Sequence, residues 1–408
     1  MKRTGGKTLE VRWADGIPVG YLYHTGPIYF TYTLEWLAGG HNLSPLSLPF
    51  DGRTHNILAD GCHGLPGFIA DALPDAWGTR VAEAVFARES WGAVTPMKLL
   101  AWVGDRAPGA LSFHPAQKFG RERNWLEKIT VERLAHEARD ILRGQPGEIA
   151  AIAIAGGSAG GAHPKALVVE HADGSLSLTR TPSTGTDVPS LLKLGLSEQP
   201  LSLRVEYSYL LMAQAAGIDL PPFKLIGEGE RPHLLIRRFD WTDGRRLHLH
   251  SLSGLWHRPK AGLDYSDLFR AAVRLGLPQT TVHEIARRML FNLYASNHDD
   301  HGRNHAFLYD HTTRQWRLSP AFDLTFTPGM LSRGLTIAGE VEPRAETLRA
   351  FLGSVAMSAA EIRTLSDQVL GAIARWEGFA TEAGVVATTC AEISATHRRV
   401  QERIGWID

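Results

Sequence analysis

The sequence predicts an α+β protein of two lobes, preceded by a further N-terminal subdomain. The chain has 408 residues, more than one typical domain needs. Strand-like segments are concentrated in its first part, and helical periodicity dominates its last part. We therefore expect an N-terminal subdomain over residues 1–145, a β-rich lobe over 146–240 and an all-helical lobe over 241–408.

The N-terminal subdomain is predicted to begin with a β-hairpin. Residues 9–13 and 18–23 have strand character and flank Ala14-Asp15-Gly16, a sequence typical of tight turns. Further elements are expected in this order: a strand at 28–33, helices at 64–88 and 97–102, a turn and strand at 105–113, and an amphipathic helix at 125–143.

The second part of the chain is predicted to change from strands to helices. Residues 152–155, 166–170 and 176–179 are expected to be strands. Helical patterns then cover residues 202–216, recur from residue 263 onward, and include the tail at 359–404.

Composition excludes several classes of protein. Acidic and basic residues balance at 43 each, so the overall charge makes no demand for nucleic acid. The two cysteines, Cys62 and Cys390, are too few for a disulfide framework and indicate a reducing compartment. The first residues lack the apolar core of a signal peptide, and no run reaches the ~18 apolar residues that span a bilayer. We expect a cytoplasmic protein with no membrane partner.

The most informative segment is residues 291–310, FNLYASNHDDHGRNHAFLYD. A helix predicted at 281–295 ends in a polar loop, and residues 305–309 resume as a strand. Asp299 precedes Asn304 by five residues, the spacing of a phosphotransferase catalytic loop. Asp323 follows in LSPAFDLTF. This pattern predicts that Asp299 orients an acceptor hydroxyl while Asn304 and Asp323 hold Mg²⁺ with ATP.

Two other interpretations of this loop remain open. A polar loop after a helix is often only structural. Alternatively, His298, His301 and His305 crowd the same segment, and imidazole with carboxylate suits zinc or iron in a hydrolase.

A glycine-rich loop forms the second constellation. It lies between the strands expected at 152–155 and 166–170, the strand–loop–strand order with which kinases cover phosphates. Glycines let backbone N–H groups approach an anion closely. The candidate nucleotide-binding residues are Gly156, Gly157, Ser158, Gly160, Gly161 and Lys165. The alternative is a flexible hairpin tip.

Further candidates surround a lysine in an apolar run. Lys193 lies in SLLKL, where a lysine is costly unless paired, and Glu206 is its candidate ion-pair partner. A snorkelling lysine and an exposed first-turn glutamate are the structural alternatives. Residues 234–240, LLIRRFD, are expected to be the hinge between the lobes, whose backbone binds adenine and whose candidate contacts are Arg237 and Phe239. The alternative for the Arg237-Arg238 pair is a solvated edge. His301 is a further candidate contact to the nucleotide.

Together these residues resemble the HipA-family toxin kinases of bacterial toxin–antitoxin systems. The resemblance covers nearly the whole chain and is carried by AGGSAGGAHPKALV, SLLKLGLS, VEYSYLLMAQAAGIDLPP, LLIRRFDW, SNHDDHGRNHAFL and RLSPAFDLT, with LPGFIADALPDAWG in the N-terminal part. It implies a bilobal protein-kinase-like fold and Ser/Thr protein kinase activity with Mg²⁺-ATP.

The resemblance also implies roles for single residues. Asp299 matches the catalytic aspartate, Asn304 and Asp323 the metal ligands, and Lys193 the ATP-contacting lysine. Ser158 matches a loop serine whose autophosphorylation inactivates family members. Arg303 departs from the lysine common in the D-x-H-x-K-N pattern, and the neighbouring Asp300 leaves two acids for the catalytic role.

The partners that the resemblance implies are a small helix-turn-helix antitoxin, operator DNA bound through that antitoxin, and a protein substrate such as an aminoacyl-tRNA synthetase. Two other functions fit the same motifs: a small-molecule kinase of this fold, and a catalytically weak, DNA-bound co-repressor. The retention of Lys193, Asp299, Asn304 and Asp323 argues against the second.

Overall fold

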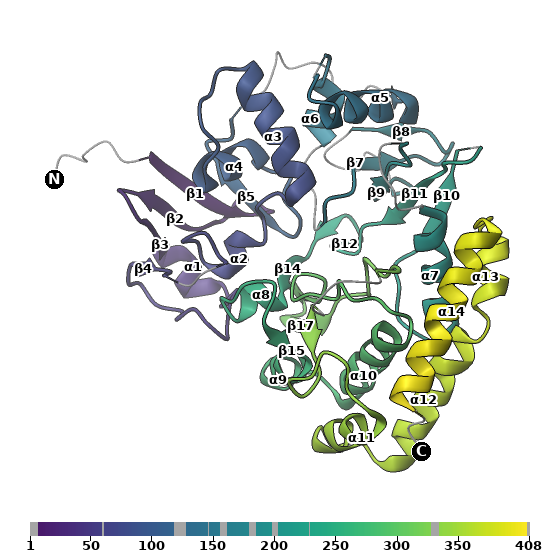
Figure 1. The fold of residues 1–408 in the computed structure, drawn as a ribbon. Helices are drawn as coiled ribbons and strands as arrows, with labels where there is room; N and C mark the ends of the chain where they lie inside the picture. The colour runs from purple at the N-terminus through teal and green to yellow at the C-terminus, as the bar shows by residue number, and fades with distance from the viewer. Residues whose placement is uncertain are drawn as a thin grey trace.

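The computed structural model describes residues 7–58, 61–117, 128–145, 147–155, 161–178, 185–197, 203–227, 229–327 and 334–405. The fold is α+β and bilobal. Figure 1 shows the first strands on one side of the molecule, a second sheet beside them, and the C-terminal helices at the far end. The expected fold class is therefore confirmed.

The N-terminal part is built on a five-stranded antiparallel sheet in the order β4-β3-β2-β1-β5. The expected hairpin pairs Lys7 with His24 across the first two strands. The strands are β1 (Lys7–Trp13), β2 (Pro18–His24), β3 (Ile28–Tyr32), β4 (His55–Asn56) and β5 (Leu111–His114).

The helices of this part of the chain follow, and side-chain caps define where several of them begin. Asp75, Thr95 and Thr130 each accept a hydrogen bond from a backbone N–H in the first turn of their helix. The helices are α1 (Leu34–Gly39), α2 (Gly67–Ala70), α3 (Ala76–Arg88), α4 (Pro96–Val103) and α5 (Val131–Leu142).

The segment before the glycine-rich loop is a helix, so the strand predicted at 152–155 is wrong. Helix α6 spans Ala150–Ala155. Its sequence, AAIAIA, alternates like a strand, but alanine is the best helix former. The guanidinium of Arg106 also donates to the carbonyls of Ala153 (2.6 Å) and Ile154 (3.1 Å) at the end of the helix. The loop is therefore entered from a helix.

The β-rich lobe is a six-stranded sheet in the order β10-β11-β9-β7-β8-β6. Its edge strand β6 (Lys128–Ile129) comes from the segment predicted as the start of a helix, which begins only at Val131. The other elements of the lobe are β7 (Lys165–Glu170), β8 (Leu176–Ser177), β9 (Val188–Lys193), α7 (Leu203–Ala215), β10 (Phe223–Ile226) and β11 (His233–Arg237).

The C-terminal lobe is mainly but not entirely helical. A three-stranded sheet, in the order β14-β16-β17, corrects the expectation of an all-helical lobe. The helices are α8 (Leu252–Leu255), α9 (Tyr265–Arg274), α10 (Gln279–Tyr294), α11 (Ala345–Ser354), α12 (Ala359–Ile373), α13 (Trp376–Glu382) and α14 (Ala387–Ile404). The strands are β12 (Trp241–Thr242), β13 (Arg245–Arg246), β14 (His248–Ser251), β15 (Leu263–Asp264), β16 (Ala306–Asp310), β17 (Gln315–Leu318) and β18 (Leu335–Thr336).

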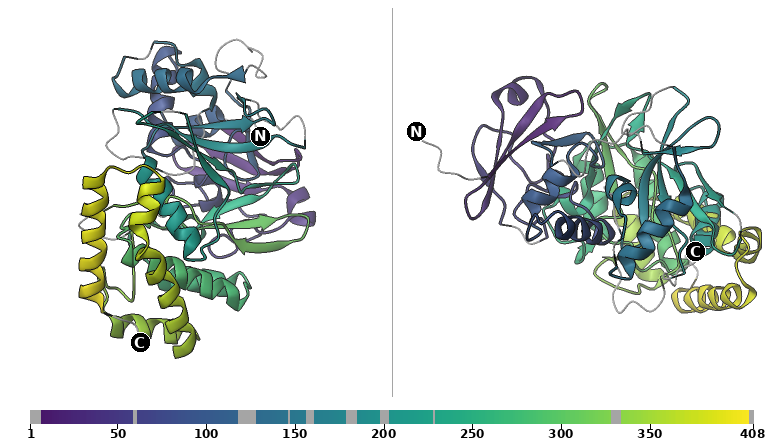
Figure 2. Two further views of the ribbon diagram at one scale, coloured as in Figure 1. Left: turned by 90° about the vertical axis from the view of Figure 1, so that its right-hand side faces the viewer. Right: turned by 90° about the horizontal axis from the view of Figure 1, so that it is seen from above.

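Buried apolar side chains of the described residues form two clusters. The first joins the N-terminal sheet and helices to the inner faces of β7 and β9, including Val168 and Leu192. The second joins α7 to the C-terminal helices; Tyr209 of α7 contacts the ring of Trp376 and its hydroxyl donates to Ala295 O (2.6 Å). Figure 2 shows α7 beside the long C-terminal helices. The β-rich lobe thus shares both of its cores with neighbouring parts of the chain.

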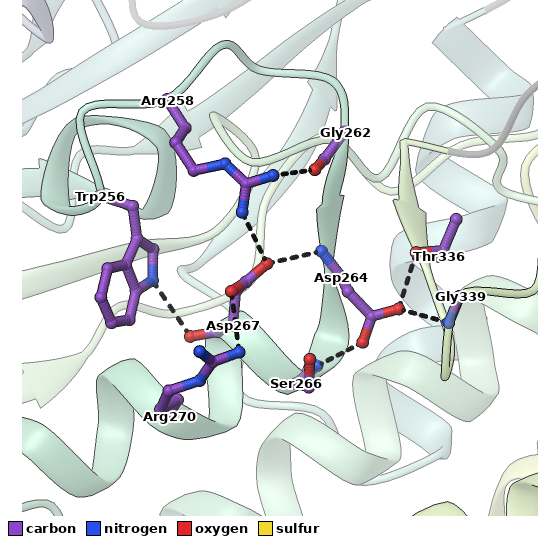
Figure 3. A network of polar contacts seen from close by, with 9 residues as sticks. All are labelled: Trp256, Arg258, Gly262, Asp264, Ser266, Asp267, Arg270, Thr336 and Gly339. Atoms are coloured by element: carbon purple, nitrogen blue, oxygen red, sulfur yellow. Dashed lines mark hydrogen bonds and ion pairs between the residues drawn. The ribbon is translucent and has the colours of Figure 1, made fainter. Parts of the chain in front are cut away.

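A polar network at the start of α9 joins this helix to the segment around β18 (Figure 3). The Asp264 carboxylate accepts from Ser266 N (2.8 Å), Thr336 Oγ1 (2.6 Å) and Gly339 N (2.9 Å), while Asp267 returns a capping-box bond to Asp264 N. The network holds β18 beside β15. Gly334, just before β18, donates its N–H to His298 O (2.8 Å).

Candidate functional site

The two adjacent aspartates of the loop at residues 295–305 differ in how far their side chains are buried. The side chain of Asp299 is 46% exposed, whereas Asp300 is buried and accepts from the Tyr265 hydroxyl at 2.7 Å. An acid that takes a proton from an incoming hydroxyl must be reachable, so this geometry favours Asp299 over Asp300 for that role.

The same loop holds its amide residue against Asp299. Asn304 Nδ2 donates to the backbone carbonyl of Asp299 at 2.8 Å. Its Oδ1 is buried and has no hydrogen-bond partner among the described residues. A buried, unpartnered amide oxygen is a suitable ligand for a hard cation such as Mg²⁺. The predicted metal ligand thus has its oxygen available.

A close approach of two backbones fixes the position of the loop. Gly302 donates its N–H to Lys260 O (2.9 Å) and accepts from Ser253 N (3.1 Å). A methyl group on Gly302 would come within 2.6 Å of Ser253 Oγ and 2.5 Å of Leu263 Cδ1. An alanine here would require the side chains of Ser253 and Leu263 to shift, which favours glycine at this place in the motif.

The predicted lysine–glutamate pair is present and includes a third charge. Lys193 Nζ lies 2.5 Å from Glu206 Oε1 and 2.5 Å from Asp323 Oδ1. Lys193 comes from β9, Glu206 from α7, and Asp323 from the C-terminal lobe. All three side chains are at least four-fifths buried. The predicted ATP-contacting lysine is thereby placed between an acid of its own lobe and the predicted metal ligand.

Burial and charge act in opposite directions on this triad. Burial alone would lower the pKa of Lys193, but the charges of Asp323 and Glu206 raise it above its usual range. Burial raises the pKa of Glu206. Burial opposes ionisation of Asp323 as well, yet the charges of Lys193 and Lys165 hold its pKa below the usual value. The lysine and Asp323 are therefore both charged.

The backbone of Asp323 adopts a conformation that side chains other than glycine seldom take. Its φ angle is +54°, in the left-handed region. Aspartate and asparagine tolerate this region better than other non-glycine residues. Strain of this kind is concentrated at functional sites, where the surrounding structure maintains it. It is consistent with a carboxylate aimed at a specific partner.

A pocket opens between the lobes beside this triad. It has roughly 950 Å³ of empty space, including its open mouth. Leu167, Leu191 and Ile236 of the β-rich lobe form apolar wall, and the rings of Phe239 and Phe322 lie 5.4 Å apart. The remaining lining residues are Asp71, Leu73, Pro108, Lys193, Arg237, Arg238, Asp240, Leu249, Ser251, Arg303 and Asp323. Apolar walls with a lysine and an acid at one end suit a planar base that carries phosphates.

Two of the predicted nucleotide contacts have other partners. Lys165, which is 1% exposed, directs its ammonium to Asp75 Oδ2 at 2.9 Å, so it joins β7 to the N-terminal subdomain. The backbone N–H groups of Arg237 and Arg238 donate to Pro222 O and Pro189 O, both at 2.9 Å. These two donors are therefore engaged within the lobe, although both residues line the pocket. Phe239 contributes its ring instead.

The remaining predicted residues have mixed outcomes. His301 is buried with its Nε2 3.9 Å from Asp299 Oδ1, and burial lowers its pKa despite that carboxylate. Gly161 has a φ angle of +96°. Gly156, Gly157, Ser158 and Gly160 lie outside the described residues.

The transition-metal interpretation gains no support from the described chain. No cluster of three or more His, Cys, Asp or Glu side chains suited to a metal ion occurs there. His305 is fully buried, its Nε2 lies 3.3 Å from Asp300 O, and burial lowers its pKa to about 3. His305 is therefore a structural residue of the loop.

Several pocket residues were not predicted. Asp71, Leu73 and Pro108 reach the pocket from the N-terminal subdomain. The stretch LPGFIADALPDAWG contains the first two, and its two aspartates close to an apolar run were a usable signal. Phe322 immediately precedes Asp323, and an aromatic residue beside a predicted ligand could also have been identified.

The fold and the site define a two-lobed protein of the protein-kinase-like class. Residues 157–395 match the model of the HipA-like C-terminal domain, and residues 9–114 match that of the HipA N-terminal domain. Because the first match alone covers more than half of the chain, the protein belongs to the HipA family.

Two similar proteins illustrate the relationship. "Putative kinase Y4mE" of Sinorhizobium fredii is 26% identical over 349 residues, covering 79% of this chain and 77% of its own length. The structure of HipA from Shewanella oneidensis MR-1, solved as a toxin–antitoxin complex with HipB and operator DNA, superposes with a TM-score of 0.71. It has 19% identity and 98% of each chain is covered, so this likeness shows the shared fold. No described helix of the present chain has the length and apolar character needed to cross a membrane.

Proposed function

We propose that the protein is a Mg²⁺-ATP-dependent serine/threonine protein kinase and the toxin of a toxin–antitoxin pair. The observation that carries the proposal is the triad of Lys193, Glu206 and Asp323 at the end of an apolar interlobe pocket. Kinases use such a lysine–glutamate pair and a following metal-binding aspartate to hold ATP phosphates. Membership of the HipA family supports the same conclusion.

The residues of the site have separate tasks in this reaction. Adenine packs against the apolar side chains of Leu167, Leu191 and Ile236. Lys193 contacts the phosphates, and Glu206 keeps its ammonium at the pocket. Asp299, at the exposed side of the loop, orients the acceptor hydroxyl and takes its proton.

The oxygens of Asn304 and Asp323 fit the hard donor set of Mg²⁺. When bound, Mg²⁺ would supply positive charge that neutralises the phosphates. Asp323 is ion-paired to Lys193 at 2.5 Å. Lys193 can therefore weaken its ion pair with Asp323 and bind the phosphates, while its ion pair with Glu206 remains.

The biological setting is proposed on the same basis. We place the protein in the cytoplasm, with a small helix-turn-helix antitoxin that brings the pair to operator DNA, and a protein substrate such as an aminoacyl-tRNA synthetase. Autophosphorylation of Ser158 would add about −1.5 to −2 charges beside the ATP phosphates and inactivate the enzyme. The units 1–145, 146–240 and 241–408 are our proposed domain boundaries.

The test compares Asp299→Asn with Asp300→Asn. Purified proteins are incubated with Mg²⁺ and labelled ATP, and label transfer to a generic basic protein and to the chain itself is measured. We expect Asp299→Asn to lower transfer by about 10²–10⁴-fold, the range for a general base. Far-ultraviolet circular dichroism establishes that both variants are folded. Full activity of Asp299→Asn would refute the assignment.

The same assay separates the competing functions. Transfer to free hydroxylated metabolites but to no protein would indicate a small-molecule kinase. ATP binding without any transfer, together with operator binding in the presence of an antitoxin, would indicate a co-repressor. Phosphopeptide mapping of the autophosphorylated chain tests Ser158, which we expect to carry the phosphate in the wild type and not in Asp299→Asn.

A further inference from the structure

The five residues between α2 and α3, Asp71 to Asp75, carry two buried carboxylates that contact different parts of the chain. We call residues 71–75 the brace segment. Asp75 is 8% exposed and Asp71 lines the interlobe pocket. Neither carboxylate is used by the proposed phosphoryl transfer.

Asp75 contacts the β-rich lobe. Its Oδ2 lies 2.9 Å from Lys165 Nζ, and both side chains are at most 5% exposed. Trp77, two residues later, donates its indole N–H to the backbone carbonyl of Lys165 at 2.9 Å. Lys165 is the first residue of β7, directly after the glycine-rich stretch. The N-terminal subdomain thus fixes the strand that leaves that stretch.

Asp71 contacts the C-terminal lobe. Its Oδ2 accepts from Ser251 N (2.7 Å) and lies 2.7 Å from His250 Nδ1, while its Oδ1 accepts from Ser251 Oγ (2.6 Å). Ser251 is also the N-cap of α8. The positive charge of Arg303 also helps to lower the pKa of the Asp71 carboxyl group. One aspartate therefore determines where α8 begins.

The start of α8 is bonded in turn to the catalytic loop. Leu252 N donates to His305 O (2.8 Å), and Ser253 N donates to Gly302 O (3.1 Å). These carbonyls lie on either side of Arg303 and Asn304 in the sequence. A displacement of Ser251 would therefore be transmitted through the backbone to the residues beside the predicted metal ligand.

We propose that the brace segment positions the two lobes for phosphoryl transfer, with Asp75 holding the strand after the glycine-rich stretch and Asp71 holding the catalytic loop through Ser251. The kinetic part of the inference rests on the proposed function. Asp71 and Asp75 are positioning residues: they act through Ser251 and Lys165. The N-terminal subdomain accordingly helps to position the residues of the active site.

The first test measures geometry and needs no activity. Spin labels are attached to Ala172→Cys in the β-rich lobe and Val273→Cys in α9, both exposed positions, in a Cys390→Ser background. Cys62 is 2% exposed and should remain unlabelled. We expect Asp71→Asn and Asp75→Asn each to broaden the distribution of label–label distances. Asp51→Asn is the matched control, since Asp51 pairs with Arg53 and His55 inside the N-terminal subdomain.

The second test measures ATP turnover of the full chain. Misplacement by about 1 Å can cost about 10²-fold in rate. We expect Asp71→Asn mainly to lower kcat and Asp75→Asn mainly to raise the KM for ATP, each by about tenfold or more. Partial unfolding would lower kcat in both and leave KM unchanged. Asp51→Asn should match the wild type.

The outcomes separate the brace from the proposed function. Unchanged distance distributions in both variants overturn the brace. So do variants that lose activity only in proportion to folded protein. If Asp75→Asn does not fold because its buried ion pair with Lys165 is lost, Asp71→Asn, which keeps that ion pair, still decides. A wild-type chain without ATP turnover refutes the proposed function, while the distances continue to test the brace.

Discussion

Replacement of Lys193 by methionine should destabilise the protein and make its stability fall as pH rises. The substitution keeps an unbranched apolar stem but removes the ammonium that lies 2.5 Å from both Glu206 Oε1 and Asp323 Oδ1. Two buried carboxylates then lie close together without the ammonium that bridges them, although the charge of Lys165 still acts on both. Removal of one partner of a buried ion pair typically costs about 3–5 kcal/mol. For a chain of 408 residues, about 2.1 cal/mol/K of unfolding entropy per residue gives about 1.2 °C per kcal/mol, so Tm should fall by about 4–6 °C.

The pH dependence follows from the shifts of the two acids. In the wild type, the pKa of Asp323 is lowered, so its stabilising contribution exists above the unfolded value and is lost as pH falls. The pKa of Glu206 is raised by burial, so its contribution has the opposite sign, and is lost as pH rises. Without Lys193 both pKa values should be raised. Lys193→Met should then lose stability as pH rises from about 5 to 8, because ionisation is opposed at both sites.

Differential scanning fluorimetry at pH 5, 6, 7 and 8 checks this expectation. Lys224→Met is the matched control: it removes a lysine from the same sheet, but one that is 54% exposed and paired with Glu170 at the surface, where a pair contributes about 0–1 kcal/mol. A Lys193→Met protein whose Tm equals that of the control, or rises with pH, would show that the triad is not held by charge in the way described.

Two further predictions concern the support of the catalytic loop. Gly302→Ala should lower kcat by at least about tenfold, because its methyl group would displace the loop from Ser253. The control is Gly353→Ala, in an open helical position, which should leave kcat unchanged and stabilise the protein by up to about 1 kcal/mol. Equal kcat values for the two variants would contradict the role of Gly302. Asp264→Ala should cost about 1–3 kcal/mol in urea unfolding at pH 7, because it removes a helix cap and the bond from Thr336. The bonds that lower the pKa of Asp264 outweigh its burial, so the wild type loses this contribution in acid, and the difference between the two proteins should shrink as pH falls below about 4. A constant difference would argue against this assignment.

The sequence predicted the elements whose signals are local. The hairpin of β1 and β2, the helix α10 and the strand β16 follow from periodicity and turn residues, and the charge conflict around Lys193 was visible as a lysine in an apolar run. Helix α6 was mistaken for a strand because isoleucine occupies every second position in the middle of AAIAIA, which is a strand period. The carbonyls at its end accept from Arg106, which lies 47 and 48 residues earlier in the chain.

A candidate site could be proposed from the sequence where a single segment carries the pattern, but its tertiary contacts could not. The spacing of Asp299 and Asn304 is a local pattern. The partner of Lys165 is not, since Asp75 lies 90 residues earlier, in a subdomain to which the sequence assigned no part of the site. The burial that distinguishes Asp300 from Asp299 also depends on a distant residue, Tyr265. Adjacent residues of one type cannot be separated without that information.

The first apolar cluster, which unites the N-terminal sheet with β7 and β9, has a consequence for damaged copies of the gene. Translation from an internal start would produce the catalytic half with the faces of Val168 and Leu192 uncovered, and such a fragment should aggregate or be degraded. Truncation would therefore yield no stable, soluble C-terminal fragment.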